Sequence, residues 1–404
     1  MNKIIFANLD LLKNEVNGVD VSKDGKDFFS IANNICSSED NLLVFVSMHN
    51  DLLREAKKAY KNQCLRFLFC LRSEVKKFVQ TFRERNYQFV FISGKEQDFH
   101  IAVQAKALFI VPAWIPCDEK VKRYGILVDN PKQLYMFIKA LNNQNYWFSK
   151  LEIEKNVTLF SLMDARYGFY AKTQEEGEML KHFENLLKQN TNRNYYEILL
   201  YHFIAGMTST ALFDDIELFG MIPSSDCSLN EDMHKFMTQV RYIKGKRLPK
   251  NNMEYDNLLI RHSKKKRAHE AYTISKRRGL GASDEFRTIC LNPEFKTKIE
   301  KLRKEKRFNV MIFDDYVTHG NTFNAVRNLL KAEGVNKLIF VALGSFNNPF
   351  IMKNYELSGS VYKDNYSVEL ISTDLLTDFE YRFDAKDEVA KLYRIFNLYE
   401  EKDC

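Results

Sequence analysis

The stretch FNVMIFDDYVTHGNTFNAVRNLL, residues 308–330, joins an apolar run to an amphipathic pattern through two aspartates and a short turn. The apolar residues 309–313 predict a buried strand, and the spacing of apolar side chains from Phe323 onward predicts a helix. In an α/β sheet, ligands bind at the carboxyl ends of strands, where loops lead into helices. Asp314 and Asp315 are therefore predicted to lie at the mouth of a binding crevice.

The turn THGNT, residues 318–322, has the composition of an anion-binding loop. Unpaired N–H groups and the helix dipole attract anions at such a turn, and Gly320 lets the backbone approach a phosphate closely. Thr318 and Thr322 add hydroxyl donors. Carboxylates repel a phosphate, so we expect the two aspartates to face donors such as ribose hydroxyls. A surface turn of acidic residues before a helix is the alternative interpretation.

Length and composition are those of a globular protein. The 404 residues are enough for about two or three domains, and 45% are hydrophobic and 28% charged. No apolar run reaches the length of about 18 residues that a transmembrane helix needs, and the apolar part of the N-terminus is short for a signal peptide. The seven cysteines contain no CxxC pair, which predicts reduced thiols and a cytoplasmic protein that does not bind membranes.

The positive charge is concentrated in one segment, residues 241–278, which we call the basic segment. It holds 13 Lys and Arg against 3 Asp and Glu, whereas the remaining residues carry a net charge of −3 within a total of +7. The segment predicts an anion site, for phosphate or for nucleic acid, with a solvated lysine-rich loop as the alternative. Its three aromatic residues, Tyr242, Tyr255 and Tyr272, do not suggest a platform for stacking single-stranded bases.

The first 145 residues alternate apolar runs with helical patterns. The predicted strands are residues 3–9, 41–48, 88–94, 107–114 and 125–129, and the helical patterns include residues 73–86 and 98–107. This alternation predicts an α/β domain with a parallel, Rossmann-like sheet over residues 1–145.

A polar, Asn-rich stretch marks the predicted domain boundary, with a linker over residues 146–172 and a second α/β domain over residues 173–404. A capping box formed by Thr173 and Glu176 predicts a helix start. Helical patterns follow at residues 178–189 and 194–207, and strands are predicted at 216–222, 308–313, 337–346 and 367–372.

The run VMIFDDYVTHGNT, residues 310–322, resembles the phosphoribosyl-pyrophosphate (PRPP) motif of the type I phosphoribosyltransferases. That motif is an apolar strand, two acidic residues, two further residues and then Thr-Thr-Gly-x-Thr. The sequence departs from it at His319, where a second threonine is usual. The resemblance implies that Asp314 and Asp315 are catalytic. The residues that it implies for PRPP binding are Thr318, His319, Gly320, Asn321, Thr322, Ser224 and Ser225.

The order of the preceding segments is similar to that of the same family. The run LFGMIPSSDCS, residues 218–228, matches an earlier strand whose loop helps to hold pyrophosphate, and residues 261–286 take the place of a basic, flexible catalytic hood. This pattern is most similar to the competence-protein-F branch. The resemblance spans about residues 175–350 and is sharpest at 308–330. The residues that it implies for pyrophosphate binding are Lys264, Lys265, Arg267, Arg277 and Arg278.

The resemblance implies a transferase of nucleotide metabolism that uses PRPP with Mg²⁺. Ribose 5-phosphate would pass to a base or nucleotide-like acceptor, and pyrophosphate would be released. The alternative is a non-catalytic PRPP or nucleotide sensor that contacts a protein or nucleic acid through the basic segment, such as a bacterial defence effector. The sequence leaves open the small-molecule acceptor and the formation of an oligomer.

The run IIFANLDLL, residues 4–12, is similar to the first strand of the haloacid dehalogenase superfamily, which ends in Asp-x-Asp. Asn8 occupies the position of the nucleophile and Asp10 that of the general acid. Ser47, at the end of the second predicted strand, matches the Ser/Thr of that family. In SGKEQDF, residues 93–99, Asp98 remains, but Lys95 replaces a metal-facing acid.

These departures predict a catalytically degenerate phosphatase-like domain. An amide such as that of Asn8 is a poor nucleophile and cannot form a phosphoaspartyl intermediate. The predicted role is binding, contact with a partner or regulation. The alternatives are an active phosphatase that uses Asp10 in a shifted register, and an unrelated Rossmann-like domain.

Overall fold

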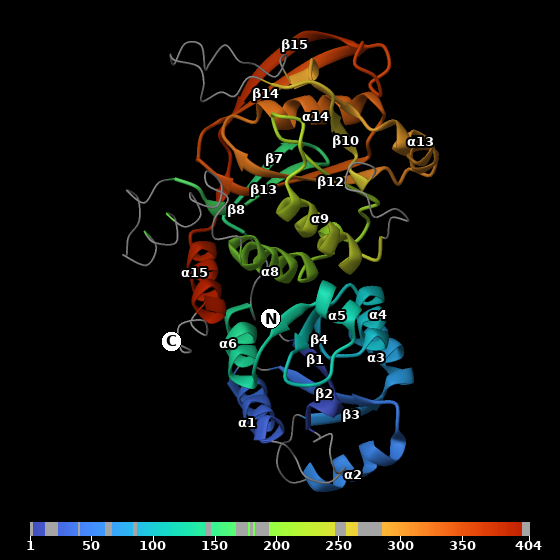
Figure 1. Cartoon of the computed structure of the whole chain (residues 1–404), viewed down its shortest axis with the longest axis vertical. Helices are drawn as coiled ribbons and strands as arrows, with labels where there is room; N and C mark the ends of the chain where they lie inside the picture. The colour runs from blue at the N-terminus through green and yellow to red at the C-terminus, as the bar shows by residue number, and fades with distance from the viewer. Residues whose placement is uncertain are drawn as a thin grey trace.

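The structure is a computed structural model, and it describes residues 3–12, 23–38, 41–60, 67–83, 87–141, 147–166, 177, 181, 194–246, 256–265 and 285–397. Two six-stranded sheets lie one after the other along the longest axis of the molecule, with helices packed on both (Figure 1). Among the helices of this described part, none combines the length and apolar character needed to cross a membrane.

The first sheet is wholly parallel. Its strands are β1 (Lys3–Asn8), β2 (Leu42–Ser47), β3 (Phe67–Leu71), β4 (Gln88–Ile92), β5 (Leu108–Pro112) and β6 (Ile126–Val128). Their order, β3-β2-β1-β4-β5-β6, is that of a doubly wound, Rossmann-like sheet. The predicted parallel α/β arrangement is therefore confirmed here, although the short edge strand β3 was not predicted.

Helices cover both faces of this sheet. α1 (Lys23–Ser38) and α6 (Pro131–Leu141) lie on one face, and α3 (Val75–Arg83) and α4 (Glu96–Gln104) lie on the other. Alternate side chains of β1 point to opposite faces. Ile5 thus belongs to the cluster that contains Phe28 of α1, and Phe6 to the cluster that contains Phe99 of α4. α2 (Asn50–Tyr60) and α5 (Glu119–Tyr124) complete this part.

The second sheet is mixed. Its strands are β7 (Ser149–Glu154), β8 (Val157–Asp164), β9 (Leu218–Met221), β12 (Asn309–Val317), β13 (Lys337–Ser345) and β16 (Glu380–Tyr381). The order is β16-β7-β8-β13-β12-β9. The four strands from β8 to β9 are parallel, and β7 is antiparallel to both of its neighbours.

The prediction of a linker over residues 146–172 is wrong for residues 149–164, because β7 and β8 form a hairpin in the second sheet. The polar appearance of residues 149–164 has a physical cause. Leu151 and Ile153 are buried, whereas Glu152 between them is exposed. The turn places Asn156 at a φ of 69°, a conformation that asparagine tolerates better than most residues. An alternating strand next to a polar turn resembles a linker when it is read by composition alone.

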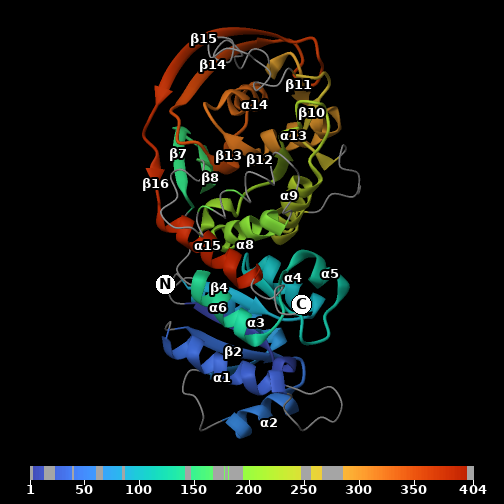
Figure 2. The same cartoon turned by 60° about the vertical axis from the view of Figure 1, so that its left-hand side comes forward.

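The face of the second sheet that points to the first sheet carries α8 (Asn194–Thr208) and α9 (Glu231–Ile243). α14 (Asn321–Ala332) covers the opposite face, and α13 (Lys296–Lys304) precedes β12. α15 (Asp384–Asn397) packs on α6 and α8 and so connects the two halves (Figure 2). The predicted helix start at Thr173 and Glu176, and nearly all of residues 178–189, lie outside the described residues.

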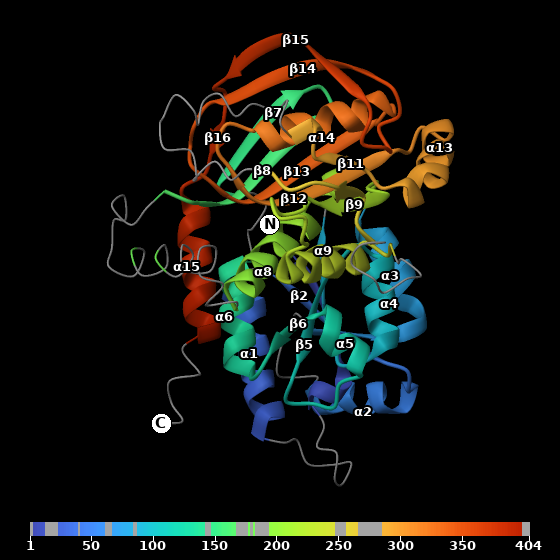
Figure 3. The ribbon, with the colours of Figure 1, turned by 45° about the horizontal axis from the view of Figure 1, so that its top comes forward.

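Two antiparallel ribbons complete the second half. One pairs β10 (Leu259–Arg261) with β11 (Ile289–Leu291). The other pairs β14 (Phe350–Ser358) with β15 (Ser367–Leu376) and lies across α14, as Figure 3 shows. β14 was not predicted from the sequence.

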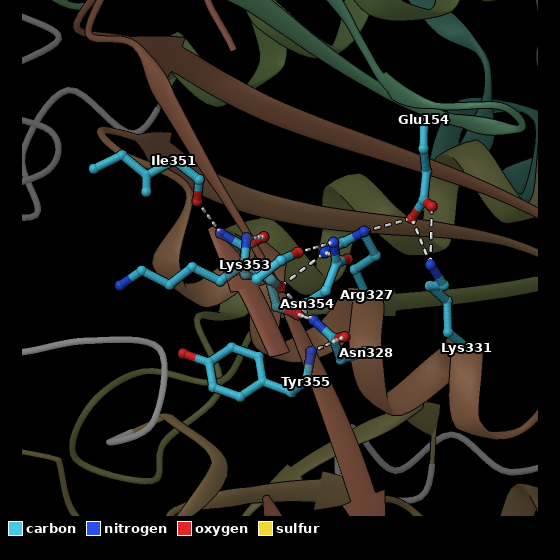
Figure 4. Close-up of polar contacts among 10 residues, drawn as sticks. Glu154, Arg327, Asn328, Lys331, Ile351, Lys353, Asn354 and Tyr355 are labelled. Carbon is cyan, nitrogen blue, oxygen red and sulfur yellow. Dashed lines mark hydrogen bonds and ion pairs between the residues drawn. The ribbon is translucent and has the colours of Figure 1, made fainter. Parts of the chain in front are cut away.

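Polar side chains of α14 form hydrogen bonds with backbone groups of β14, as the backbone of a neighbouring strand would. Asn328 accepts a hydrogen bond from the Tyr355 N–H at 3.0 Å and donates to the Lys353 carbonyl at 2.9 Å (Figure 4). Arg327 is fully buried, donates to the same carbonyl at 2.8 Å, and pairs with Glu154 at 2.5 Å. The ribbon is therefore fixed to the helix that begins at the turn 318–322.

Candidate functional site

The carboxyl ends of β9 and β12 lie side by side and bring two predicted loops to one edge of the second sheet. Met221, the last residue of β9, pairs with Phe313 of β12. The Ile222 N–H continues this pairing with a hydrogen bond to the Phe313 carbonyl at 2.9 Å. The loop that contains Ser224 and Ser225 therefore starts at the level of Asp314.

Gly320 is the residue on which the turn depends. It precedes the first residue of α14 with a φ of 77°, in the left-handed region. A Cβ atom at this position would lie 2.0 Å from Cε2 of Phe350. The ring of Phe350 thus packs directly on the turn, and only glycine fits without a shift of that ring. The predicted strand–turn–helix arrangement is present, with β12 reaching four residues further than predicted.

Asp314 and Asp315 lie within the last four residues of β12, where Asp314 is half-buried and Asp315 is exposed. The Asp315 N–H donates to Asp314 Oδ1 at 2.9 Å. Loss of hydration, followed by the charge of Asp315, raises the pKa of Asp314 well above its usual range. No Lys, Arg or His forms an ion pair with either aspartate in the part of the chain that the structure describes. Among the described residues, no basic side chain therefore compensates the charge that these two carboxyl groups carry when they are ionised.

Tyr196 of α8 lies near this acid pair from the side of the first sheet. Burial and then the charge of Asp315 raise the pKa of its hydroxyl. The hydroxyl accepts a hydrogen bond from Asn230 Nδ2 at 3.0 Å. Neither the sequence spacing nor a motif pointed to this tyrosine, because α8 reaches the site only through the fold.

A buried carboxylate connects the turn with the basic segment. Thr322 Oγ1 donates to Glu285 Oε1 at 2.8 Å, and Lys265 forms an ion pair with the same oxygen. Arg261 pairs with Glu285 Oε2 at 3.0 Å. Burial alone would raise the pKa of Glu285, but the charges of Lys265 and Arg261 outweigh it and lower that pKa. Lys265, a predicted pyrophosphate contact, is thereby placed beside Thr322.

The remaining predicted residues of this half differ in their placement. The Ser225 carbonyl accepts a hydrogen bond from the Lys265 N–H at 2.8 Å, so this loop touches the same cluster. Thr318 and His319 are exposed, and His319 Nδ1 lies 3.2 Å from the Pro349 carbonyl oxygen. Ser224 and Asn321 are half-buried and Lys264 is exposed. Arg267, Arg277 and Arg278 lie outside the described residues.

Several cations of the basic segment take part in internal ion pairs. Lys244 is buried and pairs with Asp214 at 2.7 Å, and Lys246 pairs with Glu217 at 2.5 Å. Arg241 is buried, and it lies 3.5 Å from Asp256. The described part of the segment therefore uses these charges within the fold, and the sequence count did not distinguish such charges from solvated ones.

A second site lies at the carboxyl edge of the first sheet, where a cavity of about 570 Å³ opens. The residues that line it are Asn8, Asp10, Ser47, Met48, His49, Arg72, Lys95, Glu96, Gln97, His100 and Asp118. The fold thus brings three of the four predicted degenerate-site residues to one crevice. It lies beside the junction of β1 and β4, where chain connections diverge to the two sides of the sheet.

The fourth predicted residue, Asp98, is almost fully buried and is not among the residues that line this crevice. Arg72 contacts it through Nε at 2.6 Å and through Nη2 at 3.2 Å. Ser93 Oγ donates to it at 2.6 Å, and Asn8 Nδ2 at 2.8 Å. A guanidinium group therefore compensates the carboxylate. Arg72 and Ser93 were missed from the sequence, since they match no motif position.

Within the described residues, no three His, Cys, Asp or Glu side chains come together as a metal site. No family model matches the chain, and no curated protein and no solved structure shows a significant match to it.

Proposed function

We propose that the site at the carboxyl end of β12 binds PRPP with Mg²⁺ and transfers ribose 5-phosphate to a base or nucleotide-like acceptor. The observation that supports this proposal is that two carboxyl groups and two cationic side chains lie at the same end of one strand. Asp314 and Asp315 have no basic partner among the described residues, whereas Arg261 and Lys265 both pair with Glu285, which accepts a hydrogen bond from Thr322. A ribose phosphate carries both hydroxyl donors for the carboxylates and anionic oxygens for the cations.

The acid pair also suits a ligand that arrives with Mg²⁺. Such an ion is held mainly by oxygens of the phosphates and waters, with one or two carboxylates. The raised pKa of Asp314 means that its ionised form is disfavoured without a ligand, and hydroxyl donors or a cation would stabilise that form. Asp314 and Asp315 are thus the candidate protein contacts, and the bound ion supplies neutralisation of the diphosphate.

The proposed reaction exchanges one bond at the anomeric carbon of the ribose. The bond from this carbon to the diphosphate oxygen breaks, and its electron pair leaves with pyrophosphate. A bond from an acceptor nitrogen forms, and the acceptor releases its proton. Asp314 and Asp315 hold the ribose hydroxyls, and Lys265 and Arg261 stabilise charge on the leaving group. Positioning and electrostatic stabilisation account for catalysis of this type.

For the crevice of the first sheet we propose binding without phosphoryl transfer. Asn8 supplies an amide where a carboxylate nucleophile would be needed. The Asp98 carboxylate already accepts hydrogen bonds from Arg72, Ser93 and Asn8. The crevice retains polar groups and volume for a ligand, and lacks a free carboxylate at these two positions.

Release of pyrophosphate tests the proposed transferase. The full-length protein is incubated with PRPP and Mg²⁺ and with each member of a panel of bases and nucleotides. We expect release with at least one acceptor, and its loss in the double variant Asp314→Asn/Asp315→Asn. Tight PRPP binding without release for any acceptor would instead support the regulatory sensor.

A further inference from the structure

Glu285 is placed where an anionic ligand of the proposed function would have to bind. Its carboxylate is fully buried and accepts from Thr322, Lys265 and Arg261. A threonine hydroxyl has a single hydrogen to donate. The hydroxyl of Thr322, which stands in the first turn of α14, is therefore already used by a carboxylate of the protein itself.

Arg261 would keep its position if Glu285 left. Its Nε donates to the Pro223 carbonyl at 3.2 Å, and its Nη1 donates to Thr288 Oγ1 at 2.5 Å. The guanidinium is buried, and a buried cation without an anion is strongly unfavourable. An anion beside Arg261 thus stabilises the protein, and it can come from Glu285 or from a ligand.

The backbone of Glu285 is anchored independently of its side chain. The Thr288 N–H and Thr288 Oγ1 both donate to the Glu285 carbonyl at 3.0 Å. Movement of the Glu285 side chain away from Lys265 and Thr322 would therefore leave these backbone hydrogen bonds in place. The low pKa of Glu285 keeps it ionised at neutral pH, which makes it a counter-ion and a poor general base.

We propose that Glu285 is an internal anion that occupies the subsite for a phosphate or diphosphate group at the start of α14, and that the ligand binds by displacing it. This inference rests on the proposed function and adds the competing group to it. Glu285 lowers the affinity for the ligand and stabilises the protein in its absence. A ligand with less negative charge would displace it less readily, so Glu285 favours diphosphates over monophosphates.

The test compares variants of the full-length protein by isothermal titration with two probes, PRPP and inorganic pyrophosphate, each with Mg²⁺. Glu285→Gln keeps the shape but removes the charge. We expect it to bind both probes at least about tenfold more tightly than the wild type, since like charges in one site oppose binding. Its midpoint of urea unfolding without ligand should fall. Glu369→Gln, an exposed residue of β15, is the matched control with unchanged affinity.

A purely structural role for Glu285 predicts a different pattern, in which affinity and stability fall together. That result, or an unchanged affinity in folded Glu285→Gln, would overturn the inference while PRPP binding by the wild type upheld the proposed function. If Glu285→Gln does not fold, Glu285→Asp decides. Its shorter side chain keeps a charge near Arg261 but reaches Thr322 less well, so tighter binding is again expected. Absence of binding in every variant would overturn both proposals.

Discussion

At the scale of single residues, Asp314 is the clearest link between the site and stability. Its carboxyl group loses hydration and lies beside Asp315, and both effects raise its pKa. The folded protein then binds this proton more tightly than the unfolded chain, in which the pKa is about 3.9. Stability must therefore decrease as pH rises from that value through the raised pKa of the folded state.

We predict that Asp314→Asn stabilises the protein at pH 7 by about 0.5–2 kcal/mol, as removal of a functional charge often does. The gain should shrink as pH falls, because the wild-type carboxyl group becomes protonated. Urea unfolding of both proteins at pH 7 and at pH 5 measures this difference, with the exposed Asp374→Asn as control. A destabilised Asp314→Asn with the same deficit at both pH values would contradict the account.

The crevice of the first sheet gives a second prediction at this scale. We expect no turnover of an aryl phosphate above background with Mg²⁺. Asn8 cannot be a nucleophile, and the Asp98 carboxylate is already bound by the Arg72 guanidinium. Asn8→Asp alone should not restore activity while Arg72 remains. The idea fails if the wild-type protein hydrolyses the ester and Asp10→Asn abolishes that activity, since Asp10 would then be the nucleophile.

The sequence revealed those site residues that belong to one continuous motif. Asp314, Gly320 and Thr322 lie within nine residues of each other, and their spacing alone predicts a strand, a turn and a helix. Glu285 and Tyr196 could not be found in this way. Each comes from a distant segment, and its role follows from contacts that only the packing of α8 and of the β10–β11 ribbon creates.

At the scale of elements, the turn between β12 and α14 fixes both the strand end and the ribbon that packs on it. Gly320→Ala forces a left-handed conformation on alanine and drives its Cβ into Phe350. We predict a loss of about 1–3 kcal/mol in the free energy of unfolding, together with weaker PRPP binding.

Gly334→Ala is the matched control for this change. Gly334 has nearly the same φ, 76°, but its added Cβ would meet only the flexible Arg303 side chain, at 3.2 Å. Its cost should therefore be limited to the backbone strain. Phe350 is fully buried, so Phe350→Ala is itself destabilising. In a Phe350→Ala background, however, the additional loss caused by Gly320→Ala should fall to that of Gly334→Ala. Equal losses for both glycines would mean that the contact with Phe350 is unimportant. Urea midpoints provide these values.

Elements with a clear hydrophobic period were predictable, and elements defined by tertiary contacts were not. The buried strands β1, β2, β4, β5, β12 and β13 were predicted from their apolar runs. β7 is the second strand from the sheet edge, and its buried residues alternate with more exposed ones. Its sequence was therefore mistaken for a linker. β14 pairs with β15 and with side chains of α14, among them Asn324 and Asn328, and this partner is not visible in the strand's own sequence.

At the scale of the whole molecule, the two halves share one apolar core. Residues of α1 and α6 belong to the same buried cluster as residues of α8, β12 and α15. Polar contacts cross the same boundary. Gln88 donates to the Ser209 carbonyl at 2.9 Å, and the rings of Tyr124 and Tyr242 stack with centroids 3.8 Å apart. Separation of the halves would expose this shared surface to water.

We therefore predict one cooperative thermal transition for the full chain, with equal calorimetric and van't Hoff enthalpies. A fragment of residues 1–145 should be unstable, because α6 would lose its packing on α15. Scanning calorimetry of the chain and circular dichroism of the fragment measure both. Two resolved transitions, or a fragment that melts cooperatively, would show that the halves fold independently.

In the proposed function, PRPP binds at the carboxyl end of β12 through the acid pair and the glycine turn. Isothermal titration of the full-length protein with PRPP and Mg²⁺ tests this binding most directly. We predict saturable binding by the wild type and by the control Asp374→Asn. For Asp314→Asn/Asp315→Asn, which should keep its fold, we predict a loss of at least about a hundredfold in affinity. Unchanged affinity in the folded double variant would contradict the proposed function.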